Sequence, residues 1–228
     1  MAETPENLPM VNLDYAQTGR IEGVVLFQGT APERATLDLS SNPMCERQHK
    51  EPVKDETVIV NKNGTLKNVF VYISKGLPRV KWPVPQNPRQ LNQSGCVYTP
   101  HVVGIMQGQQ LEILNSDPVN HNVHAESKVN ESWNESQPPK AEHKFKTFGA
   151  EEVLFPVTCS VHPWMRAWVG VVNHPYFEVS DKDGAFSMNN VPAGTYTVES
   201  VHEKYGKQQG QAVVTAGGTT KVEFKYAN

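Results

Sequence analysis

The sequence predicts an all-β protein, and three features of the chain support that fold class. Apolar residues recur with period two in short runs, as in the run 66–73, where Val69, Val71 and Ile73 share one face. The runs are separated by Gly, Pro, Asn and Asp, which favour turns between strands. No long stretch carries apolar residues at helical spacing.

The first third of the chain contains three expected strands. Residues 21–27 form the first, and a polar, irregular stretch follows over residues 31–55. Two further strands are expected at residues 57–60 and 66–73. Residues 75–95 are rich in Pro, Gln and Asn, and their four prolines predict a connector without regular pairing between two domains.

The middle of the chain contains the next group of expected strands. The charged stretch 125–142, with its Pro138-Pro139 pair, is predicted to be a surface loop. From Phe177 onward strand–turn–strand patterns resume, with turns at Asp183-Gly184 and Ala193-Gly194. The strands expected in the middle of the chain are residues 96–100 and 101–106 (or one bent strand), 111–115, 145–148, 153–156 and 166–172.

The charge and the apolar content of the chain argue against a nucleic-acid-binding protein and against a membrane-spanning one. The 228 residues include 21 Lys+Arg and 24 Asp+Glu, so the net charge is −3 and no basic stripe indicates nucleic-acid binding. No apolar run reaches the length that crosses a bilayer. Residues 1–19 are polar and are interpreted as a disordered lead that remains after removal of a signal peptide. A periplasmic or otherwise extracytoplasmic location is therefore expected.

One short segment concentrates soft and borderline metal ligands. Cys159, His162 and Met165 are each separated by two residues, and His121 is the best candidate for a fourth donor. A thiolate, two imidazoles and a weak thioether form the donor set of blue-copper sites. Zinc would accept the Cys and His donors but gains little from a thioether. The alternative is a small buried Cys beside a surface His and a core Met.

These residues resemble the ligand loop of the cupredoxins. The segment Cys159-Ser-Val-His162-Pro-Trp-Met165-Arg166 precedes a Val-rich strand, and its His-to-Met gap is most similar to that of amicyanin. The segment 115–124 resembles the first ligand segment of the same family, and the whole resemblance covers about residues 97–172. It implies a Greek-key β-sandwich that binds one copper ion, cycling between Cu(I) and Cu(II), through His121, Cys159, His162 and Met165. It also implies that the Asn122 side chain ties the two ligand segments together.

The C-terminal region resembles a second kind of domain. The turn Asp181-Lys-Asp183-Gly184 and the step Pro192-Ala-Gly194-Thr-Tyr196 are similar to motifs of carboxypeptidase regulatory-like, transthyretin-like β-sandwiches. The first strands of such a sandwich resemble residues 19–25 and 67–72, far upstream. We therefore expect the cupredoxin sandwich to be inserted in the smaller one, although three consecutive units are the alternative. The expected parts are residues 1–19 (lead), 20–75 and 175–228 (smaller sandwich) and 76–174 (cupredoxin domain).

Two further cysteines remain once Cys159 is assigned to a metal. Cys45 and Cys96 can pair, and a disulfide would fit an oxidising compartment. Two independent buried thiols are an equal alternative, because the sequence does not determine the geometry that a disulfide needs.

The resulting hypothesis is a single-electron carrier rather than an enzyme. His162 would present an exposed imidazole edge within an apolar docking face of Pro118, Val119, Pro163 and Trp164. The redox partner would be a protein such as a cytochrome c or a membrane redox complex. An accessory or structural copper-binding module of a larger extracytoplasmic complex is the alternative. A copper oxidoreductase would need an open coordination position or a second metal cluster, for which the sequence supplies no second Cys/His group.

Overall fold

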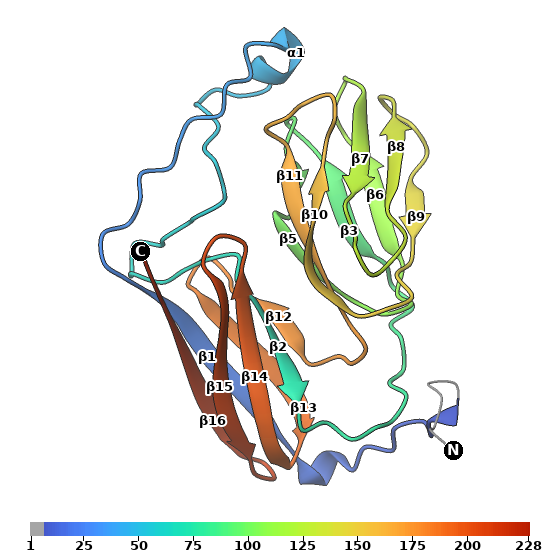
Figure 1. The fold of residues 1–228 in the computed structure, drawn as a ribbon, viewed down its shortest axis with the longest axis vertical. Coiled ribbons are helices and arrows are strands. Elements are labelled where there is room, and N and C mark those ends of the chain that lie inside the picture. The colour runs from blue at the N-terminus through green and yellow to red at the C-terminus, as the bar shows by residue number, and fades with distance from the viewer. Residues whose placement is uncertain (1–6) are drawn as a thin grey trace. The chain divides into compact units, whose positions relative to one another are not determined.

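A computed structural model describes residues 7–228, and almost all of their regular structure is β-strand, which confirms the predicted fold class (Figure 1). The described chain divides into two compact units. The first unit consists of the residues up to 31 together with 60–84 and 173–228. The second unit consists of residues 32–59 and 85–172.

The first unit contains two sheets that combine strands from both ends of the chain. The β16 strand shows why these segments form strands, since its side chains alternate strictly between exposed and partly or fully buried positions. In the first sheet β1 (Thr18–Gln28) lies between β13 (Ala185–Pro192) and β16 (Thr219–Ala227). The second has the order β12 (Phe177–Val179), β2 (Phe70–Lys75), β14 (Gly194–His202) and β15 (Gly206–Val214).

The second unit also contains two sheets, which share a hydrophobic core. This core includes Leu91, Ile113, Val157 and Val169, all essentially inaccessible to solvent. The larger sheet has the order β5 (Val102–Met106), β11 (Arg166–Val172), β10 (Glu152–Thr158), β7 (His121–Ala125) and β8 (Trp133–Gln137). The smaller has the order β4 (Tyr98–Thr99), β3 (Arg89–Gln93), β6 (Leu111–Asn115) and β9 (Lys144–Lys146).

Three strands of the larger sheet bring the two predicted ligand segments to one end. β7 and β10 are antiparallel, with Thr158 opposite His124. His121 is the first residue of β7, and Cys159 directly follows β10. The loop 159–165 then joins β10 to β11. Because the start of β7 adjoins the end of β10, His121 and this loop meet at the same edge.

The segment 32–59 differs from expectation. We expected it within the smaller sandwich of residues 20–75, but it belongs to the second unit. Leu39 and Cys45 lie in the core of that unit, and a disulfide joins Cys45 to Cys96. Its one helix, α1 (Pro43–Glu46), is a single turn. Its polar composition hides the packing of Leu39, whereas the possible Cys45–Cys96 pair was the one sequence signal that linked this segment to the second unit.

Two predicted loops contain strands instead. β3 lies within the connector 75–95, and β8 lies within the expected surface loop 125–142. Both strands are mostly polar and lack the apolar alternation that identified the others. The buried side chains of Gln93 and Gln137 hydrogen-bond to each other at 2.8 Å, so amide pairing replaces apolar packing there.

The N-terminal lead was predicted to be disordered, but residues 7–19 have a defined structure. The Val11 N–H donates to the Lys81 carbonyl at 2.8 Å, and residues Tyr15–Gln17 form a short 3-10 turn that leads into β1. Residues 1–6 of the predicted lead lie outside the described residues. Within residues 7–228 no helix is long and apolar enough to span a membrane.

Candidate metal centre

Three of the four predicted ligands converge. One donor atom from each of His121, Cys159 and His162 lies within 4.8 Å of the other two, and all three residues are buried. The Nδ1 atoms of His121 and His162 are 2.9 Å apart. The Cys159 Sγ lies 3.8 Å from the His162 Nδ1. The fourth residue, Met165, is 1% exposed, and its N–H donates to the His162 carbonyl at 2.9 Å.

Asn122 connects the two segments that carry these residues. Its Oδ1 accepts hydrogen bonds from the Ser160 N–H and, at 3.4 Å, from the Cys159 thiol. Its backbone N–H points to the Cys159 Sγ at 3.5 Å, and its Nδ2 donates to the Ser160 Oγ at 3.1 Å. The first residues of β7 and the loop after β10 are thus held together through one carboxamide.

Tyr98 provides a second connection that the sequence analysis did not identify. Its hydroxyl lies 2.7 Å from the Asn122 carbonyl and 3.0 Å from the Thr158 carbonyl. These carbonyls belong to β7 and β10, so one buried phenol bridges both ligand-bearing strands. Burial and the nearby Cys159 raise the pKa of Tyr98, which keeps the hydroxyl protonated as a donor.

Asp117 orients His121. The His121 Nε2–H donates to the Asp117 Oδ2 at 2.8 Å, and neither side chain is exposed. The backbone N–H groups of Gly95 and Cys96 donate to the same carboxylate at 2.6 and 2.8 Å. Burial would raise the pKa of Asp117, but these hydrogen bonds outweigh it and lower the pKa. The carboxylate is therefore ionised, and it fixes the His121 ring with its Nδ1 facing the His162 Nδ1.

The surroundings favour a metal-binding form of the remaining donors. Burial would raise the pKa of the Cys159 thiol, but contacts with His121 and with the backbone N–H of Asn122 lower it overall. Burial and the neighbouring His121 lower the pKa of His162, which favours its neutral imidazole. A thiolate and neutral imidazoles are the forms that ligate a metal ion.

The spacing of the donor atoms fits a single first-row metal ion, taking zinc bond lengths as the guide. Bonds of roughly 2.3 Å to sulfur and 2.0 Å to nitrogen, at about 120°, would separate those two atoms by about 3.7 Å, close to the 3.8 Å found between Cys159 and His162. The two Nδ1 atoms share a hydrogen bond at 2.9 Å. Two metal–nitrogen bonds would separate them by roughly 3.5 Å, so the rings would move apart by about half an ångström.

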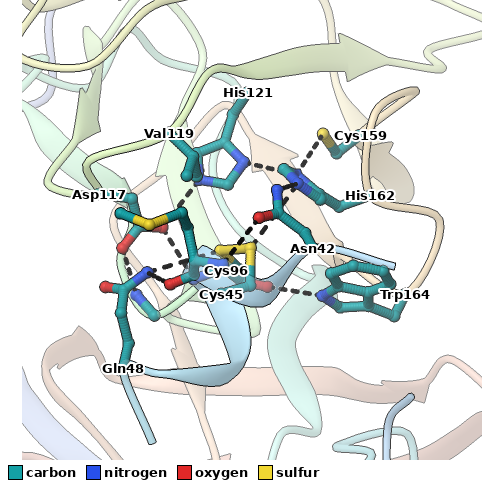
Figure 2. The surroundings of a disulfide bond; sticks show 12 residues. Asn42, Cys45, Gln48, Cys96, Asp117, Val119, His121, Cys159, His162 and Trp164 are labelled. Atoms are coloured by element: carbon teal, nitrogen blue, oxygen red, sulfur yellow. Dashed lines mark hydrogen bonds and ion pairs between the residues drawn. A yellow bond between two sulfur atoms is a disulfide. The ribbon is translucent and has the colours of Figure 1, made fainter. Parts of the chain in front are cut away.

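The predicted docking face does not have an exposed His162 imidazole at its centre. Pro118 and Pro163 are exposed and Val119 and Trp164 are half-buried, but His162 is only 1% exposed. The segment around α1 covers its imidazole, as Figure 2 shows. The Asn42 Nδ2 lies 2.8 Å from the His162 Nε2, and the Cys45 Sγ lies 3.7 Å from the same atom. The expected exposed imidazole edge is therefore wrong, because residues far upstream in the chain cover it.

The disulfide anchors this cover. Cys45 and Cys96 form a disulfide that spans 51 residues of sequence, and both are fully buried. The Trp164 Nε1–H donates to the Cys96 carbonyl at 2.9 Å, which ties the ligand loop to the same point (Figure 2). Cys159 is the remaining free thiol.

The other histidines lie apart from this cluster. His124 is half-exposed and lies 4.0 Å from Glu126. Neither it nor His101, His143, His174 or His202 belongs to a metal-ligating group among the described residues. The sequence analysis missed Asp117, Tyr98 and Asn42 as partners of the site. Only Asp117 carried a usable signal, since it lies four residues before His121.

Comparison with known proteins gives matches among solved structures alone. No family model and no curated protein matches the chain. A copper-containing nitrite reductase from Thermus scotoductus SA-01 matches with 19% identity and a TM-score of 0.35, over 44% of this chain and 25% of that one. This chain thus spans about a quarter of the nitrite reductase.

Two smaller copper proteins match as well. A methionine-to-alanine mutant of amicyanin in its Cu(I) form has 21% identity and a TM-score of 0.33, over 39% of this chain and 85% of that one. A purple cupredoxin from Nitrosopumilus maritimus has 21% identity and a TM-score of 0.32, over 36% of this chain and 98% of that one.

Proposed function

We propose that the second unit is a mononuclear type 1 copper protein of the cupredoxin kind, which carries single electrons between redox partners. The observation that supports this most directly is the buried convergence of His121, Cys159 and His162, with donor atoms within 4.8 Å of one another. Copper bound there would supply a Cu(I)/Cu(II) couple with a thiolate ligand. The weak axial donor would be Met165.

The protein's contribution to electron transfer is a rigid site. Asn122 and Tyr98 join the two ligand segments, and Asp117 holds the His121 ring. A site built on fixed strands need not rearrange when its occupant changes charge, so little energy is spent on reorganisation. The contacts around Cys159 lower the pKa of its thiol overall, which favours the thiolate form.

A second candidate function follows from the covered imidazole. Asn42 and Cys45 lie between the His162 ring and solvent, which is a poor arrangement for rapid exchange through that ring. This observation favours an accessory module that holds copper within a larger extracytoplasmic assembly. We keep it as the alternative to the carrier.

The same proposal includes the role of the first unit, the compartment and the redox partner. The first unit would be a carboxypeptidase regulatory-like, transthyretin-like sandwich that positions the copper unit. The protein would act in the periplasm or another extracytoplasmic compartment, where the Cys45–Cys96 disulfide is stable. Its partner would be a cytochrome c or a membrane redox complex.

The test is copper loading followed by optical spectroscopy and voltammetry. We expect an intense visible thiolate-to-copper band and a reversible one-electron couple, with the band lost in Cys159→Ser. His124→Ala is the matched control and should keep both. A loaded, colourless protein without a reversible couple would refute the carrier and leave a structural metal site.

A further inference from the structure

The imidazole of His162 lies between two groups of sulfur atoms. Its Nδ1 lies 3.8 Å from the Sγ of Cys159 and belongs to the candidate copper site. Its Nε2 lies 3.7 Å from the Sγ of Cys45, on the opposite side of the ring (Figure 2). The copper site proposed above uses only the first of these nitrogens.

On the Nε2 side of the ring, two sulfur atoms lie close to the imidazole nitrogen. Cys45, Cys96 and His162 are all buried, and their donor atoms lie within 4.8 Å of one another. The two sulfurs are bonded to each other, so they are not available as thiolate ligands in this state. Reduction of one covalent bond would convert them into two thiols that face an imidazole nitrogen.

We propose that opening of the Cys45–Cys96 disulfide creates a second metal site, in which Cys45, Cys96 and the Nε2 of His162 bind Cu(I). Thiolates select a soft ion. Structural zinc sites are closed by four ligands, whereas three donors meet here, which favours Cu(I) over zinc. This site goes beyond the proposed carrier function, although both sites share the His162 ring.

A dithiol reductant supplies the electrons and protons that open the Cys45–Cys96 disulfide. Thiol–disulfide exchange passes two electrons and two protons to Cys45 and Cys96, while the reductant becomes a disulfide. Each cysteine thiol releases its proton when Cu(I) binds. When both sites are filled, the His162 ring bridges two ions and releases its N–H proton as well.

The surrounding contacts keep the donors in place after the disulfide opens. The Cys96 N–H donates to the Asp117 carboxylate at 2.8 Å, and its carbonyl accepts from Trp164 at 2.9 Å. Cys45 lies in α1, which Asn42 caps by accepting from the Met44 N–H at 3.1 Å. The Asn42 Nδ2 lies within hydrogen-bond distance of the His162 Nε2. Cu(I) bound to this nitrogen would replace that contact.

The experiment compares Cu(I) binding before and after reduction. The full chain is reduced anaerobically with a water-soluble phosphine until the count of free thiols rises from one to three per chain, since one of the three cysteines is free and two are bonded. Excess phosphine is removed, and Cu(I) is titrated against a competing chromophoric chelator. We expect the reduced protein to bind one more equivalent of Cu(I) than the disulfide-bonded protein. X-ray absorption at the copper edge should show a larger average number of sulfur ligands.

Two variants test whether the additional Cu(I) binds at Cys45 and Cys96. Cys45→Ser/Cys96→Ser, treated in the same way, should bind no additional Cu(I). Cys159→Ser should still gain one equivalent on reduction, although it loses the visible band of the proposed copper site, so the two sites can fail independently. A reduced protein with three titratable thiols and no additional Cu(I) would overturn the inference, as would an equal gain in the double variant.

Discussion

Asp117 places a buried carboxylate in contact with one ligand of the candidate copper site. Its carboxylate accepts from the His121 Nε2–H at 2.8 Å, while two backbone N–H groups hold it in place. A buried negative charge stabilises the more positive oxidation state of a nearby centre. Asp117 therefore orients one imidazole, and it would favour Cu(II) over Cu(I) in the proposed copper site.

Replacement of this charge should change both affinity and potential. Asp117→Asn keeps a similar shape but removes the charge, so we expect Cu(II) affinity to fall by about 10- to 100-fold. The reduction potential should rise, because Cu(II) loses more stabilisation than Cu(I). Competition titrations and voltammetry measure the two quantities. Asp183→Asn, an exposed site in the first unit, is the control. Unchanged values in Asp117→Asn would show that the carboxylate has no influence on the ion.

Asn122 should contribute to stability even without metal. In Asn122→Ala the part-buried hydrogen bond from the Ser160 N–H to the Asn122 Oδ1 is lost, which destabilises the second unit by about 0.5–1.5 kcal/mol. Urea unfolding of the metal-free protein measures this by fluorescence, since Trp133, Trp164 and Trp168 belong to that unit. Asn120→Ala removes only an exposed hydrogen bond to Ser136 and should stay within about 0.5 kcal/mol of the wild type. Equal losses in both variants would contradict the role given to Asn122.

At the scale of elements, the ligand loop and the segment around α1 form opposite sides of one site. The loop 159–165 supplies Cys159, His162 and Met165 between β10 and β11. The segment 32–59 covers the His162 ring and is tied to Cys96 by the disulfide. The element that supplies the ligands is therefore distinct from the element that limits access to them.

Release of the cover should speed electron exchange. In Cys45→Ser/Cys96→Ser the segment loses its covalent anchor, so the His162 imidazole becomes more accessible to an external redox partner. Stopped-flow oxidation of the Cu(I) protein by a small inorganic complex should then be faster than in the wild type. Asp38→Asn, an exposed change in the same segment, should have no effect. An unchanged rate in the double variant, with its visible spectrum intact, would mean that the cover does not limit exchange.

Some of the strands could be predicted from the sequence and others could not. Strands with apolar alternation, such as β2 and β16, were predictable because their period matches the pleat. β3 and β8 were missed because their side chains are mostly polar, and buried amides such as those of Gln93 and Gln137 take the place of the apolar residues that mark a strand. Close spacing within one loop predicted the convergence of Cys159 with His162. Nothing local in residues 32–59 could show that Asn42 and Cys45 cover that same ring, because this contact spans more than 100 residues.

At the scale of the whole molecule, each of the two units combines stretches that are separate in sequence. β1 pairs with β13 and β16, and β2 pairs with β12 and β14, so strands from both ends share sheets. The second unit consists of the two stretches that lie between those strands. Each unit has its own buried groups and its own contributions to stability.

His174 makes the stability of the first unit depend on pH. Burial lowers its pKa to about 4, from an ordinary value of 6.5. Between these values the unfolded chain binds a proton that the folded chain excludes, so stability falls as pH drops from 6.5 towards 4. The full loss is about 3 kcal/mol. Urea titrations at several pH values measure it.

A neutral side chain at the same position provides the comparison. His174→Gln should flatten the pH dependence over that range. A wild-type stability that stays constant between pH 6.5 and 4 would contradict the assignment of a buried neutral imidazole.

The most direct test of the whole account is diffraction from copper-loaded crystals at the copper absorption edge. The account predicts one anomalous peak in the oxidised, disulfide-bonded protein, bonded to the Nδ1 atoms of His121 and His162 and to the Sγ of Cys159. A fully loaded crystal whose copper peak lies away from these three atoms would contradict it.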